Sequence, residues 1–182
     1  MDKNEIGKFI ALILRHRPDA IGITLDEHGW AKVEELIAGI SRNYDFNMAM
    51  LEDIVKSDNK QRYSFNDDKT LIRANQGHST KSVNINFEEV DWDKMKGKLF
   101  HGTGEKFMES IMNTGIEPRS RQYVHLSCDV NTAIKVGSRH GKPIILDIDT
   151  DEMKKRGAKL YKSENNVYLT KNVPVGCFTK HL

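Results

Sequence analysis

The sequence predicts an α+β fold in two lobes, and three patterns indicate it. Apolar residues recur at helical spacing over residues 3–55, which is typical of amphipathic helices packed on a core. Strand-like and helix-like stretches then mix over residues 98–170 without the regular alternation of a parallel sheet. A charged segment without periodicity, "NFEEVDWDKMKG", lies between these regions. We therefore expect one lobe over residues 1–88 and a second over residues 89–182.

Three helices are predicted in the first lobe. The first covers residues 3–16, the second is marked by the apolar spacing of residues 33–40, and the third begins after Asn47, a suitable N-cap. The stretch "RYSFNDDKTLIRA" follows, with two alternating runs around a polar turn, which indicates a hairpin. Helices followed by a hairpin resemble a winged helix, a module often used on nucleic acids, although that is an analogy of fold only.

The second lobe is predicted to mix short strands and helices. A strand leads into "LFHGTG", and a helix around Phe107 ends at Gly115. The strand "YVHLS", a helix opened by Asp129, the strand "PIILDID", a short basic helix at 151–156 and the strand "NVYLT" follow. This order indicates an α+β lobe.

Composition and charge exclude several functional classes. The chain has 38% hydrophobic and 30% charged residues, as soluble globular proteins do, with a formal net charge of +2. Residues 1–90 carry 12 Lys and Arg against 15 Asp and Glu, and residues 91–182 carry 16 against 11. Neither half is basic enough to coat nucleic acid non-specifically, so an anionic ligand must be held by local clusters.

Metal, disulfide and membrane signals are weak in this sequence. Cys128 and Cys177 lie far apart with no CxxC pattern, so we expect no zinc site or disulfide, and two small buried side chains. None of the seven histidines falls at HExxH or HxH spacing with acidic companions, so no metal centre is expected. No apolar run approaches the ~20 residues of a membrane span and no signal-peptide pattern opens the chain, so we expect a cytoplasmic protein.

Two features point toward a phosphate-bearing ligand. In "HGTGEKF", Gly102 and Gly104 form a partial dinucleotide-binding pattern whose third glycine position is Phe107, and a tight strand-to-helix turn explains it equally well. Arginine and histidine also recur together in "RHR" at 15–17, "KQR" at 60–62, "SRQYVH" at 120–125 and "SRHGK" at 138–142. Each cluster alone could be a solvated face. Together they indicate a phosphate site built without metal, because guanidinium groups bind phosphate bidentately.

Six segments resemble the RNA 2′-phosphotransferase family in order and approximate spacing. They are "LRHRPDAIGITLDEHGW", "DNKQRYSF", "RANQGHS", "LFHGT", "RSRQYVHLS" and "ENNVYLT", which together span nearly the whole chain. The resemblance implies an N-terminal winged-helix lobe that binds RNA and a C-terminal ADP-ribosyltransferase-like lobe that binds NAD. It also implies the activity for which the family is best known, removal of the splice-junction 2′-phosphate during tRNA splicing.

The resemblance further implies a metal-free reaction in two steps. The RNA 2′-phosphate attacks C1″ of the nicotinamide ribose of NAD and expels nicotinamide, and O2″ then attacks the phosphorus of this RNA-2′-phospho-ADP-ribose intermediate. The products are RNA with a 2′-OH and ADP-ribose 1″,2″-cyclic phosphate. The four family residues that carry the second step match Arg15, His16, Arg62 and Arg121. Arginines can neutralise the charge that builds at phosphorus, and a histidine can move a proton at a ribose oxygen.

On the NAD side, the resemblance implies contacts from two strand motifs and, more weakly, from a basic pair. The residues that match are His101, Gly102 and Thr103 of "HGT", His125 and Ser127 of "VHLS", and Arg139 and His140 toward the pyrophosphate or adenosine. A hydrogen-bonded core histidine remains the alternative for His125. Protein-modifying relatives carry a glutamate where Val167 stands here, and its absence fits a phosphate nucleophile, which a carboxylate would repel.

Two other functions remain open from the sequence. One is a winged-helix nucleic-acid binder without catalysis, and the other is an ADP-ribosyltransferase that modifies phosphorylated nucleic-acid ends and stops after the first step. The four matched residues favour the full reaction. The expected partners are therefore tRNA-like RNA with a 2′-phosphate and NAD, with no membrane partner, and we expect a monomer.

Overall fold

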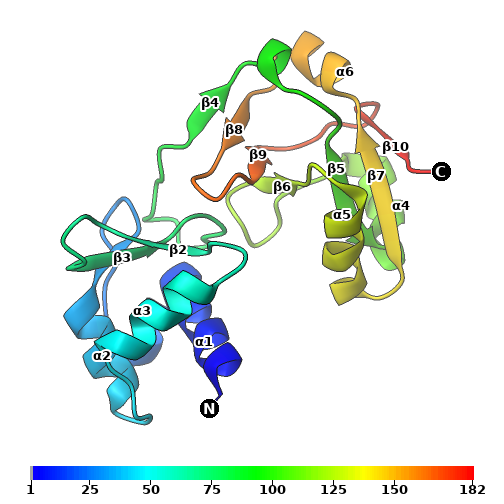
Figure 1. The fold of residues 1–182 in the computed structure, drawn as a ribbon. Coiled ribbons are helices and arrows are strands. Elements are labelled where there is room, and N and C mark those ends of the chain that lie inside the picture. Colours follow the sequence, from blue (N-terminus) through cyan, green and yellow to red (C-terminus); the bar gives the residue numbers. More distant parts are fainter. Residues whose placement is uncertain (1) are drawn as a thin grey trace. The chain divides into compact units, whose positions relative to one another are not determined.

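A computed structural model describes residues 2–182, and the chain forms two compact units. The first unit spans residues 1–86 and the second spans residues 87–182 (Figure 1). Both combine helices with small antiparallel sheets, which confirms the α+β class. Among the described residues, no helix has the length and apolar character needed to cross a bilayer.

Three helices of the first unit match the predicted apolar spacing. They are α1 (Lys3–Arg15), α2 (Val33–Ser41) and α3 (Met48–Ser57). Helix α1 begins in a capping box in which the Asp2 carboxylate accepts from the Glu5 N–H and the Glu5 carboxylate accepts from the Asp2 N–H, at 2.8 Å each. Asn47 caps α3 as predicted, accepting from the N–H of Met50 at 3.1 Å. Such caps satisfy amide donors that the first helical turn leaves unpaired.

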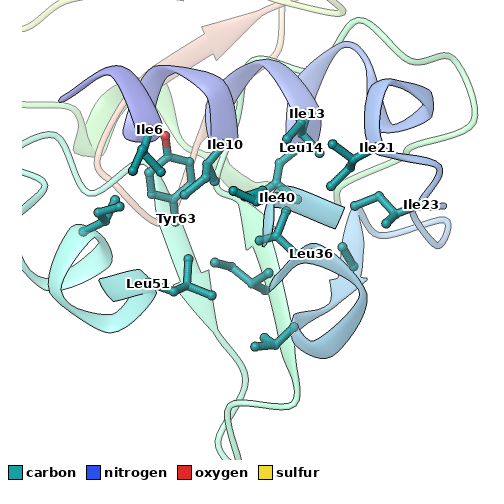
Figure 2. Close-up of a cluster of buried hydrophobic side chains, with 14 of the residues drawn as sticks. Ile6, Ile10, Ile13, Leu14, Ile21, Ile23, Leu36, Ile40, Leu51 and Tyr63 are labelled. Atoms are coloured by element: carbon teal, nitrogen blue, oxygen red, sulfur yellow. The ribbon is translucent and has the colours of Figure 1, made fainter. Parts of the chain in front are cut away.

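The sheet of the first unit has three antiparallel strands in the order β1-β3-β2. Their bounds are β1 Trp30–Lys32, β2 Tyr63–Phe65 and β3 Leu71–Ala74. The hairpin of β2 and β3 was predicted from its alternating pattern, and it pairs Tyr63 with Ala74. The three helices and the sheet enclose one core, in which Ile10, Leu36 and Leu51 are fully buried (Figure 2). This core fixes the C-terminal end of α1 relative to β2.

Two antiparallel sheets form the second unit. One has the order β10-β7-β5 and the other has the order β4-β8-β9-β6. The first contains β10 (Phe178–Lys180), β7 (Pro143–Ile148) and β5 (Phe100–Gly104). The second contains β4 (Glu88–Val90), β8 (Leu160–Lys162), β9 (Tyr168–Thr170) and β6 (Val124–Leu126). A bridge of two 2.8 Å backbone hydrogen bonds between Phe100 and Ser127 ties strand β5 to the end of β6.

Helices α4 (Met108–Thr114), α5 (Val130–Gly137) and α6 (Thr150–Lys155) complete the second unit, along with short 3₁₀-helices at Trp92–Lys94, Glu105–Phe107 and Ser138–His140. Asp129 caps α5 and Gly115, with a φ of +84°, ends α4, as the sequence predicted. Cys177 is buried as expected, but Cys128 is exposed, because it follows strand β6 and lies just before the cap of α5.

Candidate active site

The C-terminal end of α1 is held by the loop that follows β3. Helix α1 ends at Arg15, and His16 is its C-cap residue. The N–H of Ser79 donates to the carbonyl of Arg15 at 2.9 Å, and its Oγ lies 2.9 Å from Nδ1 of His16. One loop residue therefore fixes the backbone of the arginine and the ring orientation of the histidine.

Gly77 lies against the side chain of Arg15. Its φ is +91°, a conformation that side chains disfavour, and a Cβ at this position would stand 3.5 Å from Nε of Arg15. The glycine therefore allows the left-handed backbone that brings the loop up to the guanidinium. This gives a physical reason for glycine in the "QGHS" segment.

His78 is a neutral imidazole surrounded by positive charge. Only 3% of its surface is exposed, and burial lowers its pKa to about 4, with further lowering from the nearby charges of Arg15, His16 and Arg73. Within the described part of the chain its buried Nε2 has no hydrogen-bond partner. The ring thus packs beside cations without adding a charge of its own at neutral pH.

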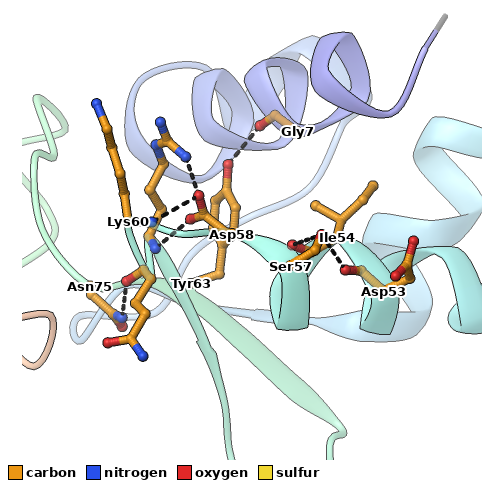
Figure 3. Close-up of polar contacts among 10 residues, drawn as sticks. Gly7, Asp53, Ile54, Ser57, Asp58, Lys60, Tyr63 and Asn75 are labelled. Atoms are coloured by element: carbon orange, nitrogen blue, oxygen red, sulfur yellow. Dashed lines mark hydrogen bonds and ion pairs between the residues drawn. The ribbon is translucent and has the colours of Figure 1, made fainter.

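Arg62 directly precedes strand β2. The next residue is a tyrosine whose pKa is affected by two of the predicted arginines. The guanidinium of Arg62 pairs with the carboxylate of Asp58. The adjacent Tyr63 donates from its hydroxyl to the carbonyl of Gly7 in α1 at 2.6 Å (Figure 3). Burial raises the pKa of Tyr63 to about 12, while the charges of Arg15 and Arg62 oppose that rise. Three of the four residues predicted for the second step therefore belong to one neighbourhood of the first unit.

In the second unit, His101 and His125 are joined through the backbone. Nδ1 of His101 donates to the carbonyl of His125 at 3.1 Å, linking β5 to β6. Burial lowers the pKa of His101, and the charges of Arg119 and His140 lower it further, although the hydrogen bond to His125 acts in the opposite direction. His101 is therefore an uncharged ring at neutral pH.

Arg121 joins this group through the ring of His125. Its Nη1 pairs with Nδ1 of His125. The residue is solvent-accessible as a whole, yet partial burial of its guanidinium lowers the pKa of Arg121, and the neighbouring Arg139 lowers it further. The structure thus brings Arg121 close to His125 and Arg139, two residues predicted for NAD. Two others, His101 and His140, lie near each other, and His101 is bonded to the carbonyl of His125.

The glycines of "HGTG" are explained by helix packing. A Cβ on Gly102 would lie 1.8 Å from the carbonyl oxygen of Ala133 in α5, and one on Gly104 would lie 2.6 Å from that of His140. Gly104 ends strand β5 with an extended backbone and is the N-cap of the 3₁₀-helix Glu105–Phe107, so the strand passes directly into a helix, as the alternative of a strand-to-helix turn expected. Gly102 therefore has no room for a side chain toward α5. Thr103, between the two glycines, is buried.

No group of three or more His, Cys, Asp or Glu side chains stands at metal-binding distance within residues 2–182.

Comparison with known proteins decides the family. Residues 1–172 match the sequence profile described as "RNA 2'-phosphotransferase, Tpt1 / KptA family". The chain belongs to this family.

Curated relatives of the family are similar over almost their full length. A protein of Fusobacterium nucleatum subsp. nucleatum is 51% identical over 93% of this chain and 94% of its own. Relatives from Flavobacterium johnsoniae and Escherichia coli O6:K15:H31 are 48% and 44% identical, covering 93% and 94% of this chain and 91% and 92% of their own. All three are named "Probable RNA 2'-phosphotransferase". The chain is accordingly a transferase of the RNA 2′-phosphotransferase family.

Sequence reasoning on this RNA 2′-phosphotransferase overlooked two polar partners. Asp58 was part of the quoted "DNKQRYSF", yet its pairing with Arg62 depends on a turn that the motif does not reveal. Ser79 was the last residue of the quoted "RANQGHS", and the motif alone does not reveal that its Oγ lies 2.9 Å from Nδ1 of His16. The available signal for Asp58 was its place four residues before the arginine.

Proposed function

We propose that the chain removes an internal 2′-phosphate from RNA by transferring it to NAD, a substrate that is consumed. The observation that carries this proposal is the grouping of guanidinium and imidazole side chains at the predicted positions, in a member of the RNA 2′-phosphotransferase family. Arg15, His16 and Arg62 share a neighbourhood in the first unit, and Arg121 pairs with His125 in the second. Such groups neutralise phosphate charge and move protons.

We infer a role for each lobe in the same way. Residues 1–88 are proposed to form a winged-helix lobe that binds RNA, which the three helices and the β2–β3 hairpin support. Residues 89–182 are proposed to form an ADP-ribosyltransferase-like lobe that binds NAD, which the two antiparallel sheets and the place of "HGT" on β5 support. Fold likeness alone does not assign an activity, so the assignment depends on the site residues.

The side chains of the second unit suit a dinucleotide. His101, Thr103, His125 and Ser127 offer imidazole and hydroxyl groups on β5 and beside β6, and we propose that they contact the nicotinamide ribose side of NAD. Arg139 and His140, at the C-terminal end of α5, are proposed for the pyrophosphate or adenosine. Because α5 fills the space at its Cα, Gly102 would contact NAD through its backbone.

The proposed reaction has two steps, a substitution at carbon followed by a substitution at phosphorus. NAD supplies an electrophilic ribose carbon, C1″, and a hydroxyl, O2″. An oxygen of the RNA 2′-phosphate bonds to C1″ as the bond to nicotinamide breaks. O2″ then bonds to phosphorus as the bond to the RNA 2′-oxygen breaks, and the proton of O2″ passes to that oxygen.

The catalytic roles follow from the side chains. Arg15, Arg62 and Arg121 are proposed to neutralise the charge that builds at phosphorus in the second step. His16 is proposed to carry the proton, because an imidazole both accepts and donates protons and Ser79 holds its ring in one orientation. No carboxylate is required as a base, since a 2′-phosphate is already ionised.

Incubation with NAD and an RNA that carries one internal 2′-phosphate tests the proposal. We expect nicotinamide release in step with loss of the 2′-phosphate, and undiminished activity in a chelator, because arginines supply the positive charge. Free inorganic phosphate without use of NAD would contradict it. An RNA-linked ADP-ribose as final product would indicate the end-modifying ADP-ribosyltransferase, and binding without turnover would indicate a non-catalytic RNA binder.

A further inference from the structure

A nearly buried carboxylate lies behind Arg62. Asp58 follows helix α3 as its C-cap residue, and only 8% of its side chain is exposed, against 35% for that of Arg62. Its Oδ2 accepts from the backbone N–H of Arg62 at 2.6 Å, and its Oδ1 accepts from the Arg62 guanidinium through Nη1 (Figure 3). One carboxylate therefore accepts hydrogen bonds from both the backbone amide and the guanidinium of the same arginine.

The turn between Asp58 and Arg62 is fixed on its other side as well. Gln61 has a left-handed backbone, with a φ of +44°, and its N–H donates to the carbonyl of Asp58 at 2.8 Å. Asn75, which is buried, donates from Nδ2 to the carbonyl of Gln61 at 2.7 Å and from its N–H to the carbonyl of Arg62 at 2.8 Å. A non-glycine residue in this conformation persists only where the surroundings hold it.

This pair differs from the ion pair that Asp53 of α3 forms. Asp53 pairs with Lys3, but its side chain is 63% exposed, and such pairs contribute little to folding because water screens them. At Asp58 the carboxylate is buried and the arginine is the more exposed partner. Among residues 2–182, only one terminal nitrogen of the Arg62 guanidinium has a hydrogen-bond partner, so its other N–H groups can bind an anion.

We propose that Asp58 is a positioning residue that holds the Arg62 guanidinium where it meets the RNA 2′-phosphate. The inference depends on the proposed role of Arg62 in the second step. An unrestrained arginine samples many rotamers, so a partner that fixes one of them raises the fraction of molecules ready for transfer. The acid itself contacts no substrate.

Asp58→Asn is the direct test, and Asp53→Asn is its matched control on the same helix. Asparagine keeps the volume and one acceptor oxygen but removes the charge. We expect the rate of the phosphate-transfer step to fall about 10–100-fold, the range seen when the supporting partner of a functional side chain is lost. The loss should appear in kcat more than in KM, and Asp53→Asn should match the unaltered chain.

A double-mutant cycle separates positioning from a general loss of structure. If Asp58 acts through Arg62, then Asp58→Asn should cost less than about twofold once Arg62→Ala is present, because coupled residues are not additive. Added guanidinium ion, at millimolar concentration, should restore part of the activity of Arg62→Ala and restore less when Asp58 is also changed. Fully additive losses, or equal rescue in both backgrounds, would overturn the proposal.

The outcomes also distinguish this inference from the proposed function. If Arg62→Ala transfers phosphate at the normal rate, the proposed roles of Arg62 and Asp58 are both wrong. If Arg62→Ala transfers phosphate slowly but Asp58→Asn does so at the normal rate, only the proposed role of Asp58 is wrong. Should Asp58→Asn fail to fold, Asp58→Glu keeps the charge but moves it by one methylene, and an unchanged transfer rate there would overturn the proposal.

Discussion

At the scale of single residues, the environment of His78 has a consequence for acid stability. Burial and three cationic neighbours hold its pKa at about 4 in the folded chain, below the value near 6.5 of an unfolded histidine. The unfolded state therefore binds more protons between these values, so the free energy of unfolding decreases as pH falls from about 6.5 to about 4. The stabilisation is fully present above this window.

We expect His78 to account for about 3 kcal/mol of this loss in the first unit. Urea unfolding at about pH 7 and at about pH 3.5, a range that spans both pKa values, measures it. The fluorescence of Trp30 reports the first unit alone in a Trp92→Phe background, because the chain has two tryptophans. His78→Gln should flatten the dependence on pH, and an equal slope in both proteins would contradict the prediction.

The proposed phosphate-binding arginines should separate the two chemical steps. Arg121→Ala removes a guanidinium held beside His125, and we expect the second step to slow by about 10²–10³-fold, or about 2.7–4 kcal/mol. The first step depends on the NAD pocket and should slow less, so the RNA-2′-phospho-ADP-ribose intermediate should accumulate. Rapid-quench gels of labelled RNA measure both steps.

Arg17 provides the matched control for that experiment. It lies two residues from Arg15 but is exposed and paired with Asp19. Arg17→Ala should leave the rates of both steps unchanged. If Arg121→Ala slows both steps equally, the assignment of Arg121 to the second step is wrong.

At the scale of elements, the contact between β5 and α5 leaves no space at Gly102. A methyl group there would lie 1.8 Å from the Ala133 carbonyl oxygen, so the helix would have to move. We expect Gly102→Ala to cost at least about 3 kcal/mol of stability in the second unit, the upper range for overpacking. Unfolding followed by the fluorescence of Trp92 in a Trp30→Phe background measures this cost, because Trp92 lies in the second unit and its Nε1 donates to the carbonyl of Ala158.

Gly157→Ala is the appropriate comparison for Gly102. Gly157 has a φ of +71° but nothing within 4 Å of a new Cβ, so only backbone strain of about 1–2 kcal/mol is expected. Similar losses of stability in the two variants would show that α5 can move to accommodate a methyl group at position 102. The explanation of the "HGTG" glycines would then be incorrect.

The elements that the sequence predicted are those with strong local signals. Helices α1 and α3 combine apolar spacing with an N-cap, and the hairpin of β2 and β3 combines alternation with a polar turn. Strands β4, β8 and β10 escaped prediction, although β6 and β9 have the same length of three residues and were predicted, so length alone does not explain the difference. Their existence depends on pairing with distant strands.

The candidate site was predictable in residue type but not in its supporting contacts. Clusters of arginine and histidine stand out in a chain that is close to neutral. The pairing of Asp58 with Arg62 requires Gln61 to adopt a left-handed backbone, which glutamine seldom does. Likewise the need for glycine at position 102 arises from Ala133, more than thirty residues later. Neither requirement is encoded locally.

At the scale of the whole molecule, each unit has a hydrophobic core of its own. We therefore expect a fragment of residues 1–86 to fold alone and to reproduce the acid dependence assigned to His78. Dispersed amide NMR signals and a cooperative urea transition would support this. A fragment that remains unfolded at neutral pH would show that the first core is insufficient by itself.

The hydrogen bond from His101 to the carbonyl of His125 also restricts what this ring can recognise. With its only proton on Nδ1 and a pKa lowered by burial, the neutral ring presents Nε2 as a lone pair. A molecule that meets it must contribute the hydrogen, as a hydroxyl or an amide N–H does. A phosphate oxygen or a carbonyl would face lone pair against lone pair, so we expect Nε2 of His101 to favour hydrogen-bond donors over anions.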